Sequence, residues 1–341
     1  MSRQVAPVPI QRVIAAHLQL TILNGPLDQA KFRENGREYY ERWVHTYPYP
    51  CDAVRPWIPS QHETIIDKMQ DELERLDSMH CAWYIVALDN RLHLATLRPG
   101  PLRILDIGYG TGIWAVEMKK RYPDSKIIAL DIGNDHPTVD VDGRPVDYGV
   151  DFLPGVDFMQ DVLDLEEGSF DFIHAGMLHS SVEALETGKT LSAGLLVSGQ
   201  AEFVELDWTP RCDHASSPGS SEVSQWWRAM QIASTSLGKP LDYPADIEAI
   251  IQRAGCTVVN HRVINVHTAE DIIDLDSEDP QNWITRWYRY FMFVPTFKTV
   301  KGMSMVLLTR QLGWSPEDVA ALAVRVNYQL NHTLSPYYHD L

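Results

Sequence analysis

Three glycines at alternate positions mark the segment best suited to bind a ligand. They are Gly108, Gly110 and Gly112, they follow a short apolar run, and Asp106 lies two residues before the first of them. Glycine leaves the backbone open to close approach, and the N–H groups at the start of a following helix point outward. A dinucleotide fingerprint would also need glycine at position 113, which is Ile113. The pattern therefore predicts a ligand-binding strand–loop–helix of another kind, with a purely structural turn as the plain alternative.

Acidic side chains come at the ends of two further apolar runs. Asp131 ends the second run, 19 residues after Gly112 (131 − 112), where a carboxylate can accept both hydroxyls of a ribose. Asp161 closes a third run in the same way. Taken alone, each acid is equally well explained as a solvated loop residue or a helix cap. Because ligands of parallel sheets bind outside the carboxyl ends of the strands, the acids and the glycine loop together favour one site.

The runs that carry these residues alternate with helical segments. A helix is expected over 113–122, directly after the glycine loop. The expected strands are 103–108, 126–133, 156–162, 169–177 and 201–208. Strands that alternate with helices indicate a parallel α/β sheet with helices on both faces.

The flanking segments carry weaker patterns. Apolar residues at helical spacing over 10–22 predict an amphipathic arm that packs on its own fold or on a partner subunit, with a transit peptide as the alternative. Residues 28–60 are rich in aromatic residues and prolines, which predicts an irregular loop, and a helix is expected from Ser60. Beyond the sheet, the patterns predict helices over 223–237 and 243–255, a strand over 257–266, a strand or helix over 303–310, and a last helix with Ser315 as N-cap and Pro316 at its first position.

The composition narrows the partners and the compartment. The chain has 341 residues, 45% of them hydrophobic, and a net charge of −17 (29 − 46). An excess of acids argues against DNA, RNA or an anionic membrane as the main partner, since these need clustered Lys and Arg. The four cysteines show neither metal-ligand spacing nor a disulfide framework, so we expect reduced thiols, no metal and a cytoplasmic protein. The uncharged run over 190–201 is too short and too polar to span a bilayer.

Six blocks of sequence support a more specific interpretation. They are residues 34–39, 49–52, 88–93, 105–114, 204–213 and 312–315. In this order they resemble the fungal LaeA-like class I S-adenosylmethionine-dependent methyltransferases, from about residue 32 to the C-terminus. That family includes a global regulator of secondary metabolism and enzymes encoded in natural-product clusters. The resemblance implies a Rossmann-like α/β sheet and S-adenosyl-L-methionine as the cofactor.

The resemblance also assigns residues to the cofactor. It implies that the glycine loop lies against the methionine part, with Asp106 near its amino group, and that Asp161 contacts the adenine. The implied cofactor-binding residues are Tyr39, Asp106, Gly108, Tyr109, Gly110, Gly112, Asp131, Ile132, Asp161 and Val162. Tyr39 is the candidate for a lid over the cofactor. Two positions depart from the family: Tyr109 replaces the usual Cys and could crowd or gate the sulfonium, and a shortened turn over 197–200 replaces Lys-Pro-Gly-Gly before the fifth strand.

The same resemblance suggests a division of the chain. We expect an N-terminal arm with a helical and aromatic cap over 1–97, and a methyltransferase domain over 98–341. Within that domain, 102–208 forms the cofactor-binding core and 209–341 supplies C-terminal substrate and cap elements. Aromatic residues over 36–57 and 283–293 could roof the pocket and exclude water, although a core role explains many of them.

Methyl transfer needs the acceptor held in line with the methyl group, and a hydroxyl or amine acceptor also needs a base. Candidates after the fourth and fifth strands are His174, His179, Glu205 and Asp207. His174 lies within a strand, which favours a hydrogen-bonded core residue. His179 follows the strand end and is the catalytic candidate, with an ordinary polar loop residue as the alternative. Glu205 and Asp207 are expected to line or support the pocket.

The leading hypothesis is a methyltransferase that acts on a hydroxyl, carboxylate or amine of a small molecule in fungal secondary metabolism. It has no nucleic-acid or membrane partner and leaves room for a homodimer. One alternative is a LaeA-like regulator, in the nucleus, that works through protein partners. Another is a cofactor-binding enzyme that does not methylate. A short N-terminal segment and the lack of a basic cluster favour the first hypothesis.

Overall fold

The structure is a computed structural model of the chain. It describes residues 31–35, 37–40, 80, 88, 91–133, 136–138, 145–158, 168–178, 195–212, 221–241, 243, 246–253, 255–267, 297–332 and 337–340. The arm expected over 10–22 and most of the helix expected from Ser60 lie outside these residues.

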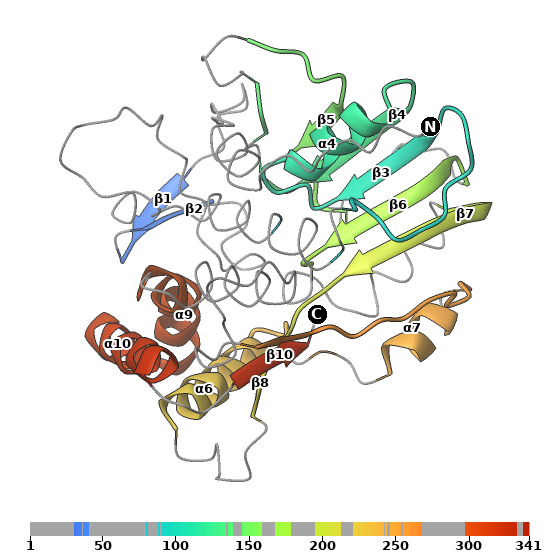
Figure 1. Ribbon diagram of the computed structural model, residues 1–341. Helices are drawn as coiled ribbons and strands as arrows, with labels where there is room; N and C mark the ends of the chain where they lie inside the picture. Colours follow the sequence, from blue (N-terminus) through green and yellow to red (C-terminus); the bar gives the residue numbers. More distant parts are fainter. Residues whose placement is uncertain are drawn as a thin grey trace, which may run out of the picture.

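The largest sheet has five parallel strands (Figure 1). Its strands, in spatial order, are β5 (Asp151–Pro154), β4 (Lys126–Asp131), β3 (Arg103–Ile107), β6 (Phe170–Gly176) and β7 (Leu195–Val204). The chain steps outward from β3 to β4 and β5, then returns to the other side of β3 for β6 and β7. The direction therefore reverses between β3 and β6, and this switch point is where open α/β sheets form a ligand crevice.

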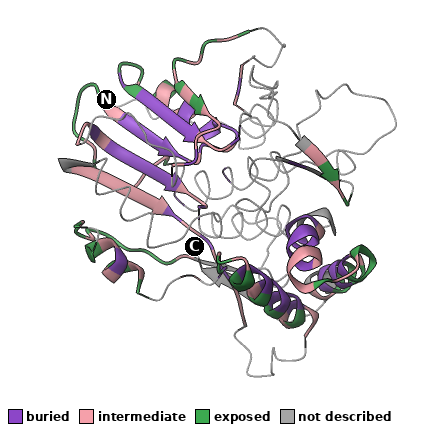
Figure 2. Cartoon of the chain, turned by 180° about the vertical axis from the view of Figure 1, so that it is seen from behind, coloured by how far each residue is buried: buried purple, intermediate pink, exposed green. Residues whose placement is uncertain are grey.

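The central strands are buried because their sequences are apolar on both faces (Figure 2). On one face, Ile104 of β3 and Phe172 of β6 pack with Trp114 and Met118 of α4 (Ile113–Arg121). On the other face, Leu105 and its neighbours on β4 and β6 form a second cluster. A parallel sheet covered in this way confirms the predicted α/β fold class.

Three of the five expected strands, the first, second and fourth, match β3, β4 and β6. The third strand was expected over 156–162, but β5 covers Asp151–Pro154 and residues 156–158 are not in a strand, while 159–162 lie outside the described residues. At Gly155 the chain turns with a φ of 72°, and its N–H donates to the carbonyl of Gly133 (3.1 Å). The fifth strand begins at Leu195 and ends at Val204, so the expected range 201–208 spans two strands.

A second sheet of three antiparallel strands has the order β8–β10–β9. Its strands are β8 (Asp207–Cys212), β9 (Asn265–His267) and β10 (Tyr337–Asp340), and β10 lies between the other two. Only the last two residues of the strand expected over 257–266 are in β9. The helix α7 (Ile247–Arg253) is shorter than the expected 243–255.

Three helices pack together beside the second sheet (Figure 1). They are α6 (Glu222–Ser236), α9 (Phe297–Leu312) and α10 (Pro316–His332). The indole N–H of Trp226 on α6 donates to Ser304 Oγ on α9 (2.7 Å), and both residues are buried. The segment 303–310, expected as a strand or a helix, is helical because it lies within α9. Ser315 Oγ accepts from the N–H of Asp318 (3.1 Å), which confirms the predicted N-cap of α10.

Residues 31–40 form a β-hairpin where an irregular loop was expected. Its strands are β1 (Lys31–Glu34) and β2 (Arg37–Tyr40), and Asn35 takes a φ of 51° in the turn between them. Arg310 of α9 pairs with Glu34 and lies over the ring of Phe32, so the hairpin is fastened to the C-terminal helices. Within the described ranges, no helix is long and apolar enough to cross a membrane.

Candidate functional site

The glycine loop lies at the carboxyl end of β3 and leads into α4. Gly108, Gly110 and Gly112 have φ values of 73°, 56° and 79°, in the left-handed region that glycine adopts without steric cost. The Gly108 N–H donates to the carbonyl of Leu130 on β4 (2.8 Å), which holds the loop against the next strand. Gly112 is the N-cap of α4 and has no side chain that could cap it, but the hydroxyl of Thr111 accepts from the N–H of Ile113 at the start of the helix (3.4 Å).

Neighbouring loops occupy the space that side chains at these glycines would need. A Cβ at Gly108 would lie 2.4 Å from Leu178 Cδ2, and one at Gly112 would lie 2.8 Å from Phe152 Cε1 and 2.9 Å from Pro137 Cδ. Real Cβ atoms do not approach other atoms this closely. The positive φ favours glycine at both positions, and at Gly112 the rings of Phe152 and Pro137 add a steric requirement.

Asp131 at the end of β4 ties the loops together. Its Oδ2 accepts from the N–H of Gly110 (2.9 Å) and its Oδ1 accepts from the N–H of Gly133 (2.6 Å). The carboxylate therefore joins the glycine loop to the end of β4. The ribose role of Asp131 stays a prediction. Ile132 follows directly and is partly exposed beside it.

Asp106 and His174 form a buried pair across β3 and β6. Their exposed fractions are 2% and 4%, and Nδ1 of His174 lies 2.7 Å from Oδ1 of Asp106. The imidazole also stacks on the indole of Trp114, with ring centroids 3.7 Å apart. The prediction that His174 is a hydrogen-bonded core residue is confirmed.

Tyr109 packs into an aromatic cluster. Its ring meets Phe152 edge-on with centroids 5.1 Å apart and His136 with centroids 6.1 Å apart, and its hydroxyl donates to the carbonyl of Gly133 (3.2 Å). Only 5% of the residue is exposed. The structure therefore favours a fixed wall beneath the loop over the gate considered for this side chain.

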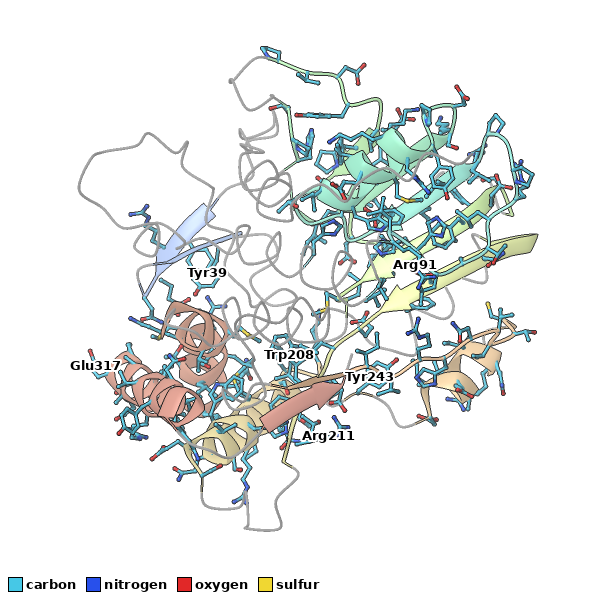
Figure 3. The ribbon with its side chains drawn as sticks, in the orientation of Figure 1. Tyr39, Arg91, Trp208, Arg211, Tyr243 and Glu317 are labelled. Carbon is cyan, nitrogen blue, oxygen red and sulfur yellow. The ribbon has the colours of Figure 1, made fainter. Side chains whose placement is uncertain are left out.

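Tyr39 lies on β2, beside α9 (Figure 3). It is 1% exposed, its ring is 5.7 Å from the ring of Phe32, and the guanidinium of Arg310 lies 5.9 Å from its centroid. These contacts hold its ring next to Phe32 of β1 and Arg310 of α9. Its role as a lid stays a prediction. Asp161, Val162 and His179 lie outside the described residues, so the adenine and base assignments stay predictions too.

Glu205 follows β7 and reaches the glycine loop through one residue. Its Oε1 accepts from the backbone N–H of Leu178 (3.0 Å), and the Leu178 side chain fills the space above Gly108. Met177, just before, takes a φ of 56° and donates its N–H to the carbonyl of Val204 (2.8 Å). The ends of β6 and β7 are thus joined at the switch point.

Asp207 begins β8 and is held by two neighbours. Its Oδ1 accepts from the Thr209 N–H (2.9 Å) and its Oδ2 accepts from Arg211 Nη2 (2.6 Å). Burial acts to raise the pKa of Asp207, but the bonds from Thr209 and Arg211 outweigh it and leave the pKa below its usual value. The carboxylate is therefore ionised at neutral pH.

Tyr243 completes this polar group and was not expected from the sequence. Trp208, Arg211 and Tyr243 gather around β8 and β10 (Figure 3). Burial, followed by the charges of Glu205 and Asp207, raises the pKa of Tyr243 to about 12. Its phenol therefore remains protonated and can donate a hydrogen bond. We call Glu205, Asp207 and Tyr243 the β7-end polar group.

Comparisons with known proteins identify the family of the chain. A family model described as a methyltransferase domain matches residues 83–261. The chain is 26% identical over 298 residues to the secondary metabolism regulator laeA of Aspergillus fumigatus, covering 86% of this chain and 70% of that protein. It is 28% identical over 295 residues to the regulator LAE1 of Cochliobolus heterostrophus, covering 85% of each.

Solved structures are more distant. A putative sarcosine dimethylglycine methyltransferase from Galdieria sulphuraria aligns with a TM-score of 0.40 at 14% identity, covering 82% of this chain and 89% of that one. A geranyl diphosphate C-methyltransferase from Streptomyces coelicolor A3(2) aligns at 0.39 and 15% identity, covering 99% and 98%. With scores this low, the fold assignment rests on the strand order and on the family match.

Proposed function

The chain belongs to the methyltransferase domain family, and we propose that it methylates a small-molecule acceptor, at a hydroxyl, carboxylate or amine, in fungal secondary metabolism. Membership confirms the prediction of an S-adenosylmethionine-dependent methyltransferase and of its cofactor. The resemblance to LaeA-like proteins is confirmed by relatives of that name that cover most of the chain. The acceptor and the pathway are the proposal.

The described residues fit the cofactor. Asp106 has a buried carboxylate oxygen, Oδ2, with no hydrogen-bond partner among these residues, which suits an ammonium donor. Asp131 ends β4 with its carboxylate against the glycine loop, at the sheet edge where ribose hydroxyls are bound in open α/β sheets. These residues would hold the methionine and ribose parts of the molecule.

The chemistry divides between the cofactor and the chain. S-adenosylmethionine, when bound, supplies a methyl group already activated by a sulfonium. The chain must place the acceptor about 3 Å from that methyl group, exclude water and take a proton where the acceptor carries one. We propose His179 for the last task, since it follows Leu178 and hence the end of β6.

The β7-end polar group is the observation that carries the small-molecule proposal. Glu205 is one residue away from the glycine loop through Leu178, and Tyr243 lies in the field of two carboxylates. Trp208 and Leu241, with exposed fractions of 5% and 1%, are apolar neighbours in the chain. The three polar side chains are partly buried beside these apolar residues, a combination that suits a site for a small ligand.

The positions of the sheets along the chain also bear on its division into domains. We propose a cap over 1–97 and a methyltransferase domain over 98–341, with 102–208 as cofactor core and 209–341 as substrate and cap elements. The parallel sheet ends at Val204 and β8 (Asp207–Cys212) belongs to the other sheet, which supports an end of the core close to the proposed residue 208. A cytoplasmic enzyme that forms a homodimer and does not bind nucleic acid completes the proposal.

A regulatory role is the second candidate, because the relatives cited above are named as regulators of secondary metabolism. In that case the cofactor would serve methylation of a protein, or regulation through protein partners, and the protein would act in the nucleus. The same glycine loop would serve both functions.

One labelling experiment separates the candidates. The purified protein is incubated with methyl-labelled S-adenosylmethionine and either metabolite extract or protein extract of the fungus that encodes it, with Asp131→Asn as a variant expected to bind the cofactor more weakly. We expect label in a small molecule with the native chain and much less with the variant at the same low cofactor concentration. Label confined to protein would refute the proposal in favour of the regulator. The absence of label anywhere, with cofactor binding retained, would refute methyl transfer to small molecules as well.

A further inference from the structure

The buried pair at the switch point has features that a simple core contact does not need. Asp106 and His174 are register partners on adjacent parallel strands, and their side chains meet at 2.7 Å. A carboxylate can only accept hydrogen bonds, so Nδ1 of His174 donates. Each residue is nearly inaccessible to solvent.

Two further contacts fix the imidazole ring. Trp114 stacks on it with an angle of 9° between the ring planes, and the indole N–H of Trp114 donates to the carbonyl of Leu92 (2.8 Å). Trp114 itself belongs to α4, which begins at the glycine loop. The ring therefore has one orientation, and its Nδ1 holds Asp106 Oδ1 in one position.

The second oxygen of Asp106 has no such partner. Oδ2 is buried and makes no hydrogen bond to the residues that the structure describes. A buried polar atom without a partner is costly, and more so on a charged group. Asp106 lies two residues before Gly108, where the chain turns toward the loops around the switch point. A donor from a bound molecule would satisfy this oxygen.

We infer that His174 is a positioning residue, which fixes Asp106 so that Oδ2 remains available to the ammonium group of the cofactor's methionine part. The inference rests on the proposed function only for the cofactor and not for the acceptor. His174 does not contact the cofactor in this account. It acts by occupying Oδ1 and by preventing rotation of the carboxylate.

Two substitutions separate the hydrogen bond from the ring stack. In His174→Asn the amide nitrogen is as many bonds from the backbone as Nδ1, so a donor remains while the ring is lost. In His174→Phe the ring remains while the donor is lost. Calorimetry measures binding of S-adenosylhomocysteine, which carries the ammonium group, and of 5′-methylthioadenosine, which lacks the whole amino-acid part.

We expect His174→Phe to weaken S-adenosylhomocysteine binding on the order of tenfold, about 1.4 kcal/mol, with 5′-methylthioadenosine unaffected. His174→Asn should restore most of the affinity. Equal losses of affinity for both ligands, or no loss for either, would overturn the inference. It would also be overturned if the His174→Asn protein bound S-adenosylhomocysteine more weakly than the His174→Phe protein.

Controls keep the result interpretable. His93 is also hydrogen-bonded and near the same core, with Nε2 2.7 Å from the hydroxyl of Tyr122, but it precedes β3. His93→Phe should leave both affinities unchanged. If His174→Phe fails to fold, Asp106→Asn tests the same oxygen, and an unchanged preference for S-adenosylhomocysteine over 5′-methylthioadenosine would overturn the inference. Because no acceptor is present, these results do not depend on whether a small molecule is methylated.

Discussion

Replacing Asp131 by Asn tests the hydrogen bonds that join the glycine loop to the end of β4. Asp131 accepts from the N–H groups of Gly110 (2.9 Å) and Gly133 (2.6 Å). An Asn amide has one oxygen that can accept and one NH2 that cannot, so one of the two backbone donors loses its partner. Hydrogen bonds to charged groups contribute about 1.5–3 kcal/mol each, so we expect the free energy of unfolding to fall by about that amount.

The same substitution removes one oxygen that is proposed to accept hydrogen bonds from the ribose hydroxyls. Loss of one or two hydrogen bonds worth about 1.4–2.8 kcal/mol in total would weaken S-adenosylhomocysteine binding about 10- to 100-fold. Denaturant unfolding measures the stability, and calorimetry on the folded variant measures the affinity. Asp151→Asn is the matched control, since Asp151 pairs with Lys126 at the opposite end of the sheet and both side chains are more than half exposed. Unchanged affinity in a folded Asp131→Asn protein would refute the ribose assignment.

Three further predictions concern the loop, the helices and the polar group. In denaturant unfolding, Gly112→Ala should lower the free energy of unfolding by about 2–4 kcal/mol, through backbone strain and the close contacts described above. Gly313 also has a positive φ but has open space around it, so Gly313→Ala should lower it by only about 1 kcal/mol. Ser304→Ala should cost about 1–3 kcal/mol by leaving a buried indole N–H without its acceptor, while Ser236→Ala on the exposed end of α6 should cost much less; equal costs would contradict this. The pKa of Tyr243 is raised in the folded protein, so its contribution to the free energy of unfolding is present below pH 10 and lost as the pH rises toward 12. Tyr243→Phe should therefore reduce the fall in thermal stability at alkaline pH. An identical pH profile of thermal stability would count against the burial of the phenol.

The sequence allowed the cofactor side of the fold to be predicted because its signals are local. The apolar runs of β3 and β4 have the length of a strand, and the glycines that follow β3 leave few other interpretations. The third strand was misplaced because β5 alternates exposed and partly buried residues, whereas the segment after Gly155 is more apolar. The hairpin was missed because its strands are four residues each and stand before many prolines.

The β7-end polar group could not be predicted because its members are distant in sequence. Tyr243 comes 36 residues after Asp207 (243 − 207), and no spacing rule links a lone tyrosine to carboxylates so far away. Leu178 reads as an ordinary apolar residue, yet it joins Gly108 to Glu205. The short spacing from Asp207 to Thr209 was a usable signal, since an Asp side chain that accepts from the N–H two residues later is a common local turn.

The central place of β10 in the second sheet has a consequence for synthesis on the ribosome. Tyr337 pairs with Cys212, which leaves the ribosome 125 residues earlier (337 − 212), or about 6–25 s at usual elongation rates. Until β10 appears, β8 and β9 have no strand between them, whereas every pairing of the parallel sheet is available once Val204 is made. The nascent chain can therefore assemble the loops around Asp131 while the strand that carries Asp207 still waits for its partner.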